Sequence, residues 1–340
     1  MPTLRRVLER SKENLKDRIW DEVLEKLASI GIVSDRDLIL REEKDIYSKL
    51  VIRPEYVQEL ISLAVKECSA VVVTGDSWQQ EKEYFSTGCR EVDNILEGGL
   101  LAGEISEFAG PSGSGKTQLA FYTLLNTLIT RPYSTAMFID TVNCFSANRL
   151  ETLLNTSEQF KNLREPELTT QNILSRIHHI QCFDAYSLLA VIEAIGDNLS
   201  EKSGFYGNLC LIVIDCISTV FAPLLSFSQS QGHALMAMAG RALQDLCLDR
   251  NIVILLVNGA VGVRRPTQGN FVGTNTRPAL GATWAFMPST QLYFLQHEGD
   301  EQLHEDKCMK RICEITRCRR IAADKWCYLF LDESDISSSR

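Results

Sequence analysis

A glycine-rich octapeptide carries the residues whose possible chemistry is easiest to identify. Residues 110–117 read GPSGSGKT, which fits the pattern G-x-x-x-x-G-K-[ST] at every fixed position. Glycines let successive backbone N–H groups turn toward a phosphate, the lysine amine reaches phosphate oxygens, and the last hydroxyl ligates Mg²⁺. The predicted phosphate-binding residues are Gly110, Pro111, Ser112, Gly113, Ser114, Gly115, Lys116 and Thr117. The alternative interpretation is a glycine-rich turn without a ligand.

The segments on both sides of this octapeptide are those that a nucleotide-binding loop requires. An apolar run over residues 103–109 precedes it, and a helical pattern over residues 118–128 follows it. A strand, a loop and a helix in this order aim the positive helix N-terminus at the phosphates. The context therefore favours a nucleotide site over a bare turn.

A second apolar run supplies a candidate metal ligand. Residues 209–215 read LCLIVID, as expected for a strand that is buried on both faces and ends in one carboxylate. Beside Thr117, the Asp215 carboxylate can hold Mg²⁺ through its water shell. A plain strand-end cap is the alternative. The predicted metal site is Thr117 with Asp215.

The elements that must position these residues alternate between strand and helix from Phe85 onward. Such alternation predicts an α/β core with a mainly parallel twisted sheet, flanked by helices. The expected strands are 105–109, 136–140, 177–182, 209–215, 252–258 and 290–296. Before this core, apolar residues recur at three- and four-residue spacing, which predicts a small all-helical N-terminal domain.

These patterns divide the chain into four segments. They are a helical N-terminal domain over 1–66, a linker with a short strand over 67–84, the core over 85–331, and a tail over 332–340 that we expect to be disordered. The strand of the linker, residues 68–73, either packs within its own chain or adds to the sheet edge of a neighbouring subunit.

Two loops at strand ends are candidates for binding a polymer. The first covers residues 223–233, and the second covers residues 259–277 and is rich in Gly, Thr and Asn. Guanidinium groups and an aromatic ring in such a loop suit the backbone and bases of single-stranded DNA. The candidate DNA-binding residues are Arg264, Arg265, Phe271 and Arg277. We expect weak, salt-sensitive binding, and an ordinary surface loop is the alternative.

The overall composition limits the possible functions. The 340-residue chain is 45% hydrophobic and has a net charge of -9, so any DNA contact must be local. No apolar run approaches the roughly 18 residues of a membrane span, and we see no signal-peptide core. We therefore expect no membrane association. Eleven cysteines without a C-x-x-C pair indicate free thiols in a reducing compartment.

Together these motifs resemble the core of RecA-type recombinases. The resemblance covers nearly the whole chain and rests on residues 86–93 (STGCREVD), 98–104 (GGLLAGE), the phosphate loop with Gln118, and 138–141 (FIDT). Among the eukaryotic recombinase paralogues, the D-type member is resembled at residues 179–184 (HIQCFD), 277–281 (RPALG), Trp284, Phe286 and 288–290 (PST). The helical N-terminal domain matches only in outline.

The resemblance implies a RecA-like P-loop ATPase core that binds ATP and Mg²⁺, with Gln118 among the nucleotide-binding residues. It implies a subunit that acts in homologous-recombination DNA repair within a complex of recombinase paralogues. Such a complex would assist assembly or remodelling of the recombinase filament on single-stranded DNA. The N-terminal domain and linker would contact one neighbour and the core another. A nuclear location follows from the resemblance alone.

Two positions depart from the pattern of active recombinases. Val142 stands where active members carry a glutamate that orients the attacking water, and Gly259 stands where they carry a glutamine that senses the γ-phosphate. Losing a group that activates water typically lowers a rate by about 10²- to 10⁴-fold. Asp140 is too far from that water to substitute. We expect ATP binding with slow hydrolysis and assign no confident catalytic residue.

Two alternatives stay open. One is an active DNA-dependent strand-exchange ATPase, which Val142, Gly259 and the sparsely basic loop disfavour. The other is a P-loop protein of another kind, either a small-molecule kinase or a RecA-fold P-loop protein without a role on DNA. A kinase would need a lid segment with several arginines, and we find no such segment.

Overall fold

The computed structural model places most of the chain in two units. The described residues are 4, 8, 18–68, 82–201, 204–225, 230–268, 273–296, 308–323, 325–332 and 335–337. One unit comprises Met1–Glu81 with Gly196–Glu201, and the other comprises Lys82–Ile195 with Lys202–Arg340. Each unit contains a hydrophobic core of its own.

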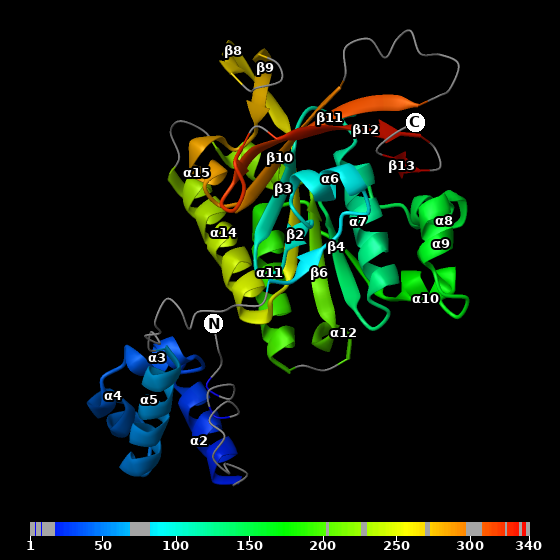
Figure 1. Ribbon diagram of the computed structural model, residues 1–340. Coiled ribbons are helices and arrows are strands. Elements are labelled where there is room, and N and C mark those ends of the chain that lie inside the picture. Colours follow the sequence, from blue (N-terminus) through cyan, green and yellow to red (C-terminus); the bar gives the residue numbers. More distant parts are fainter. Residues whose placement is uncertain are drawn as a thin grey trace. The chain divides into compact units, whose positions relative to one another are not determined.

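The first unit contains short helices around a small apolar core (Figure 1). The helices are α2 (Arg18–Ser29), α3 (Asp35–Ile39), α4 (Glu43–Lys49) and α5 (Pro54–Cys68). Ser34 and Asp37 form a capping box at α3, because the Ser34 hydroxyl accepts a bond from the Asp37 amide (3.1 Å) and the Asp37 carboxylate accepts one from the Ser34 amide (3.0 Å). Gly31, with φ +78°, provides the left-handed residue that follows α2.

The predicted linker begins later than expected, because α5 continues through Cys68. The remaining residues of the expected linker strand, 69–73, lie outside the described residues. The choice between packing within the chain and adding to a neighbour's sheet therefore stays a prediction.

A nine-stranded sheet forms the centre of the second unit, in the order β13-β12-β11-β10-β3-β7-β6-β4-β5. The strands are β3 (Ile105–Ala109), β4 (Thr135–Asp140), β5 (Ile177–Gln181), β6 (Leu209–Asp215), β7 (Val253–Asn258), β10 (Thr290–Gln296), β11 (Met309–Cys318), β12 (Trp326–Leu331) and β13 (Ile336–Ser337). The strands from β10 to β5 run parallel. These six are the predicted strands, with ends shifted by at most one residue.

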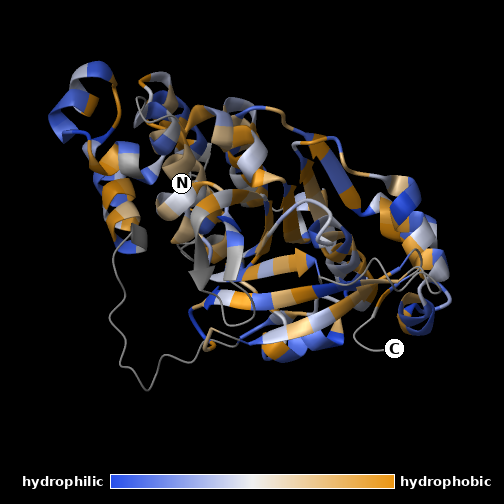
Figure 2. Cartoon of the chain, turned by 90° about the horizontal axis from the view of Figure 1, so that it is seen from above, coloured by the Kyte–Doolittle hydropathy of each residue, from blue (hydrophilic) through white to orange (hydrophobic). Residues whose placement is uncertain are grey.

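Helices cover both faces of this sheet, as predicted for a parallel arrangement (Figure 1). The helices are α6 (Arg90–Ile95), α7 (Lys116–Thr130), α8 (Ala147–Thr156), α9 (Glu158–Leu163), α10 (Thr170–Ser175), α11 (Ala185–Glu201), α12 (Gly204–Gly207), α13 (Ile217–Phe221), α14 (Ser230–Arg250) and α15 (Gly281–Ala285), with a 3₁₀ turn at Ala222–Leu224. Central strands such as β6 and β7 consist mainly of hydrophobic residues, whereas the helices and the outer strands carry both hydrophobic and hydrophilic residues (Figure 2).

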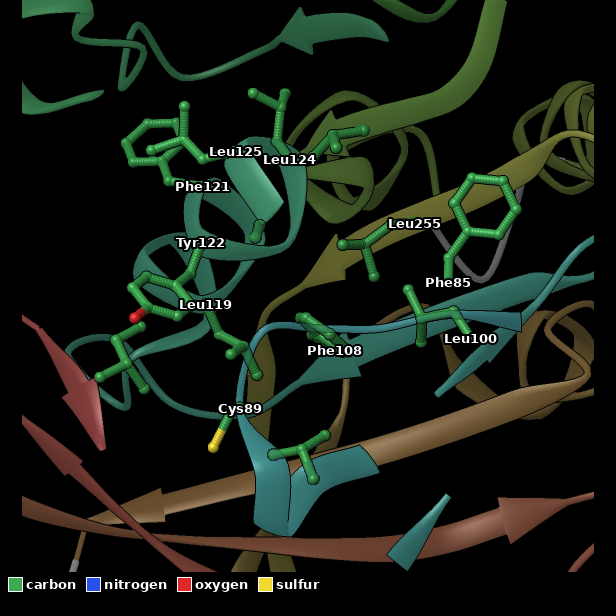
Figure 3. Close-up of a cluster of buried hydrophobic side chains, with 14 of the residues drawn as sticks. Phe85, Cys89, Leu100, Phe108, Leu119, Phe121, Tyr122, Leu124, Leu125 and Leu255 are labelled. Atoms are coloured by element: carbon green, nitrogen blue, oxygen red, sulfur yellow. The ribbon is translucent and has the colours of Figure 1, made fainter. Parts of the chain in front are cut away.

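The helix that follows the phosphate loop is anchored in the main core. Leu119 and Tyr122 of α7 lie near Phe108 of β3 and Leu255 of β7 (Figure 3). All four side chains are fully buried, and burying a large apolar side chain contributes about 1.5–3 kcal/mol. The core therefore fixes the start of α7 against the strands that surround the phosphate loop.

Three antiparallel additions were not predicted. Strands β11 to β13 extend the sheet beyond β10, β1 (Tyr84–Phe85) pairs with β2 (Leu100–Leu101), and β8 (Ala260–Gln268) pairs with β9 (Gly273–Pro278). The last pair is a separate hairpin that projects from the sheet (Figure 1). The second candidate loop is thus largely a hairpin, and the end of the first, residues 230–233, belongs to α14.

The tail was expected to be disordered, and for residues 335–337 this expectation is wrong. Ile336 pairs with Leu331 of β12 and is buried. The Tyr122 hydroxyl donates a hydrogen bond to the Asp335 carboxylate, which ties the tail to α7. An apolar contact and a partly buried hydrogen bond thus order a segment whose composition suggests disorder. Among the described residues, no helix has the length and hydrophobicity that crossing a membrane requires.

Candidate nucleotide-binding site

The phosphate loop connects the buried strand β3 to α7 and depends on glycine at two points. Gly110 has φ +150°, and a Cβ there would lie 2.3 Å from the Phe294 carbonyl oxygen. Gly115 has φ +96°, and a Cβ there would lie 2.4 Å from the Leu331 side chain. Real Cβ atoms do not approach so closely. Glycine is required at Gly110 by both space and backbone conformation, because the neighbouring atom is backbone, and at Gly115 chiefly by the positive φ, because the end of the Leu331 side chain can move aside.

The Lys116 amine lies inside the loop that its own backbone forms. Its Nζ donates hydrogen bonds to the Pro111 carbonyl (2.6 Å) and to the Ser114 hydroxyl (3.3 Å). Burial lowers the pKa of the Lys116 ammonium, while Cys216 and Asp215 act in the opposite direction. The Lys116 amine is held inside the loop as a hydrogen-bond donor, which suits recognition of phosphate oxygens.

Thr117 and Asp215 meet as the predicted metal site requires. The Thr117 hydroxyl donates to the Asp215 carboxylate at 2.6 Å, and Asp215 is only 3% exposed. Burial raises the pKa of Asp215, and the bonds from Thr117 and Cys144 and the charge of Lys116 oppose this effect. Hydroxyl and carboxylate oxygens are ligands that Mg²⁺ prefers, so the side chains present fit the ion.

A cavity of about 1080 Å³ opens over the loop, which is enough for a nucleotide. The predicted residues that line it are Gly110, Ser112, Gly113, Gly115, Lys116, Thr117, Gln118 and Asp215. Pro111 and Ser114 do not line it and instead hold the Lys116 amine. The structure therefore brings both nucleotide motifs to one cavity.

Two arginines in the cavity wall were missed by the sequence analysis. Arg149, near the start of α8, donates from Nε to the Gln118 side-chain oxygen at 2.9 Å. Arg311, on β11, donates from Nε to the Gly113 carbonyl at 3.2 Å. Both guanidinium groups line the cavity and add positive charge beside a phosphate site. No local pattern distinguishes them from surface arginines, because each reaches the site through tertiary packing.

Val142 holds the position at which active recombinases carry a water-activating glutamate, and Asp140 precedes it by two residues. Val142 is 43% exposed, whereas Asp140 is fully buried, and neither lines the cavity. The Asp140 carboxylate accepts bonds from the amides of Val142 (3.1 Å), Cys144 (3.1 Å) and Phe145 (3.0 Å), and His179 Nε2 lies 3.3 Å away. Burial alone would raise the pKa of Asp140, but these donors hold it below its ordinary value. Asp140 thus anchors a loop.

The candidate DNA-binding residues lie on the hairpin or outside the described residues. Arg264 and Arg265 belong to β8, although the positions of their side chains are not described, and Phe271 lies outside the described residues. Arg277 belongs to β9 and is exposed. Arg277 does not line the cavity, whereas Gly259 and Ala260 at the base of the hairpin do.

The phosphate loop after β3, the carboxylate at the end of β6 and the surrounding parallel sheet define a RecA-like core. A comparison with protein families agrees, because the model of the Rad51 family matches residues 79–333. The chain belongs to the Rad51 family.

Individual relatives show the same relationship, and one solved structure shares the fold. DNA repair protein RAD51 homolog 4 of Bos taurus is 28% identical over 280 residues, which cover 81% of each chain. DNA repair protein RAD51 homolog 3 of Cricetulus griseus is 26% identical over 300 residues, which cover 79% of each chain. The crystal structure of the RadB recombinase shares the fold, with a TM-score of 0.57 and 21% identity over 75% of this chain and 100% of that chain. The resemblance to the recombinase paralogues, including the D-type member, is confirmed.

Proposed function

We propose that the chain is an ATP-binding subunit of a recombinase-paralogue complex in homologous-recombination DNA repair, and that it hydrolyses ATP slowly. One observation carries this proposal. The phosphate loop, Lys116 and the Thr117–Asp215 pair are assembled around one cavity, while the position expected to activate water holds Val142.

The binding half of the proposal is supported by residues that are already in place. Lys116 is held inside the loop, Arg149 bonds Gln118, and Arg311 bonds the loop backbone. Mg²⁺ would be held by Thr117 and, through water, by Asp215, and would neutralise charge on the β- and γ-phosphates. The chain's own residues would bind and orient the triphosphate.

The proposal that hydrolysis is slow is supported by the side chains of Val142 and Asp140, at and near the expected water-activating position. The Val142 side chain has no polar atom, and the Asp140 carboxylate is occupied by backbone amides. Loss of such a group lowers a rate by about 10²- to 10⁴-fold. ATP would then remain bound long enough to act as a structural ligand.

A retained nucleotide would stabilise the assembled complex. A ligand that binds only the folded, assembled form contributes RT ln(1 + [L]/Kd), about 4 kcal/mol when its concentration is about 1,000 times Kd. Strand β5 offers a place for a neighbour, because it ends the sheet order and pairs only with β4 among the described strands. A linker strand from another paralogue could add there by backbone hydrogen bonding.

The complex would act in the nucleus, where it would assist the recombinase filament on single-stranded DNA. The β8–β9 hairpin would give weak, local DNA contact, in keeping with the net charge of -9. The names of the relatives support this setting, because both relatives described above are DNA repair proteins.

The test is single-turnover ATP hydrolysis by the full chain, with and without single-stranded DNA, alongside the affinity for a fluorescent ATP analogue. Tight binding with slow turnover that DNA does not change is the expected result. Fast, DNA-stimulated turnover would favour a strand-exchange ATPase instead. Absence of nucleotide binding would overturn the proposal.

A further inference from the structure

A buried carboxylate next to the phosphate loop has no role in the site described above. Glu107 lies on β3, three residues before Gly110, and is fully buried. Its Oε1 accepts hydrogen bonds from Asn258 Nδ2 and from Trp284 Nε1, both at 2.8 Å, and its Oε2 accepts one from Gln291 Nε2. Burial raises the pKa of Glu107, while these three donors oppose the effect. One side chain thus connects β3 with β7, α15 and β10.

Asn258 carries this connection to the base of the β8–β9 hairpin. It is the last residue of β7, and its Nδ2 also donates to the Ala279 carbonyl at 3.3 Å. The Ala279 amide in turn donates to the Gly259 carbonyl at 2.9 Å. Residues 259 and 279 stand immediately before and after the two strands of the hairpin. The Asn258 side chain and the Gly259 backbone therefore close the hairpin at its base.

The side-chain oxygen of Asn258 has no hydrogen-bond partner among the described residues, whereas its side-chain nitrogen donates two hydrogen bonds. Asn258 is fully buried. A buried acceptor without a donor is unfavourable, and an apolar side chain would avoid that cost. The two N–H donors are thus the part of this side chain that the fold uses.

A second link joins the same base to the strand that carries Asp215. The Gly259 amide donates to the Ser218 hydroxyl at 3.0 Å, and Ser218 lies on α13, which follows β6. Gly259 and Ala260 also line the nucleotide cavity. The hairpin base is therefore bonded toward both motif strands and forms part of the cavity wall.

We infer that Glu107 and Asn258 are positioning residues that couple occupancy of the nucleotide cavity to the order of the β8–β9 hairpin. The inference rests on the proposed function, because it requires a nucleotide in that cavity. A nucleotide beside Gly259 and Ala260 restricts the motion of the hairpin base. Asn258 links this base to β3, because its amide bonds both Ala279 and Glu107. The coupling replaces a glutamine that would sense the γ-phosphate, because Gly259 has no side chain to do so.

Coupling of this kind is reciprocal. If the nucleotide orders the hairpin, then any ligand that orders the hairpin must raise nucleotide affinity by the same factor. The ligand expected at the hairpin is single-stranded DNA. A network that only stabilises the fold would change the free energy of unfolding without changing this linkage.

The test is amide hydrogen exchange of the full chain with and without a slowly hydrolysed ATP analogue and Mg²⁺, read at residues 260–262 and 276–277. In the natural chain, nucleotide should slow exchange there by about 5- to 150-fold, the usual range of coupling between sites. In Asn258→Ala, this slowing should fall below about 2-fold, while the Kd for nucleotide changes less than about 3-fold, because Asn258 does not line the cavity. Glu107→Gln, which keeps the side-chain shape, should weaken the slowing to an intermediate value.

Asn126→Ala is the matched control. Asn126 is also a buried amide that donates to a backbone carbonyl, that of Ser86 at 3.1 Å, but it lies near the far end of α7. This variant should keep the nucleotide-dependent slowing. The inference is overturned if the natural chain binds nucleotide without slowing exchange in the hairpin, or if Asn258→Ala and Glu107→Gln both retain the full slowing. Loss of nucleotide binding by the natural chain would instead refute the proposed function.

Discussion

The Thr117 hydroxyl lies 2.6 Å from the Asp215 carboxylate, although the two residues are 98 positions apart in the sequence. Thr117 is set by the start of α7 and Asp215 by the end of β6, two elements whose apolar faces share one core. The pairing shows that the hydrophobic core, and not a local motif, brings the two halves of the metal site together.

Lys116→Ala should weaken nucleotide binding about 10- to 100-fold, because hydrogen bonds to charged groups contribute about 1.5–3 kcal/mol. The affinity for a fluorescent ATP analogue gives the value. If ATP stabilises the complex, the affinity for the paralogue partner should fall in parallel at limiting nucleotide. Lys161→Ala is the control, because Lys161 is an exposed lysine whose ion pair is with Glu158. Equal nucleotide affinity in both variants would contradict the role given to Lys116.

Asp215→Asn should raise the Mg²⁺ concentration needed for half-maximal nucleotide binding by about 10-fold or more, because one carboxylate charge is removed from the ion's surroundings. Titration of Mg²⁺ at fixed nucleotide measures the change. Binding of nucleotide in the presence of a chelator should change much less. An unaltered Mg²⁺ requirement would mean that Asp215 serves only as a partner of Thr117.

Val142→Glu should increase the single-turnover rate of ATP hydrolysis by about 10-fold or more, because it returns a carboxylate to the position that orients water in active recombinases. Val142→Gln is the control, because glutamine has nearly the same shape as glutamate but lacks its charge. The hydrolysis rate of this variant should stay close to that of the natural chain. A rate that is unchanged in Val142→Glu would show that a further element of the hydrolytic site is missing.

Asp140 should make the stability of the core depend on pH. Its pKa is lower in the folded chain than in the unfolded chain, so its contribution is fully present above the unfolded value of about 3.9 and is lost as pH falls through the folded value. Denaturant unfolding of the full chain, without nucleotide and with a chelator, measures the effect from neutral pH down to below about 3.9, the value at which the carboxyl titrates in the unfolded chain. The difference between the natural chain and Asp140→Asn should shrink toward acid. A difference that is constant with pH would count against this assignment.

The parallel half of the sheet was predictable because its strands are buried on both faces and therefore read as continuous apolar runs, as in residues 209–215. Strand β11 was missed because it buries charged residues. Arg311 and Glu314 are both buried, yet in the sequence MKRICEITRC they look like surface residues. The β8–β9 hairpin was missed because its Gly-, Thr- and Asn-rich composition is typical of loops.

Within the site, the phosphate loop and Asp215 could be found from the sequence because their chemistry requires fixed residue types at fixed spacing. Arg149, Glu107 and Asn258 could not be found in this way. Their roles depend on which distant side chains they reach, such as the bonds from Arg149 to Gln118 and from Asn258 to Glu107. A sequence pattern that is local carries no information about such contacts.

Leu331, on the late strand β12, packs closely against Gly115 of the phosphate loop. Leu331 occupies the space that a side chain at Gly115 would fill, and Arg311 holds the Gly113 carbonyl. A premature stop codon anywhere before Leu331 therefore removes one wall of the phosphate loop, even though the GPSGSGKT motif and Asp215 are still translated. For genetic variants of this chain, the loss of a late and apparently motif-free segment is equivalent to damage at the loop itself.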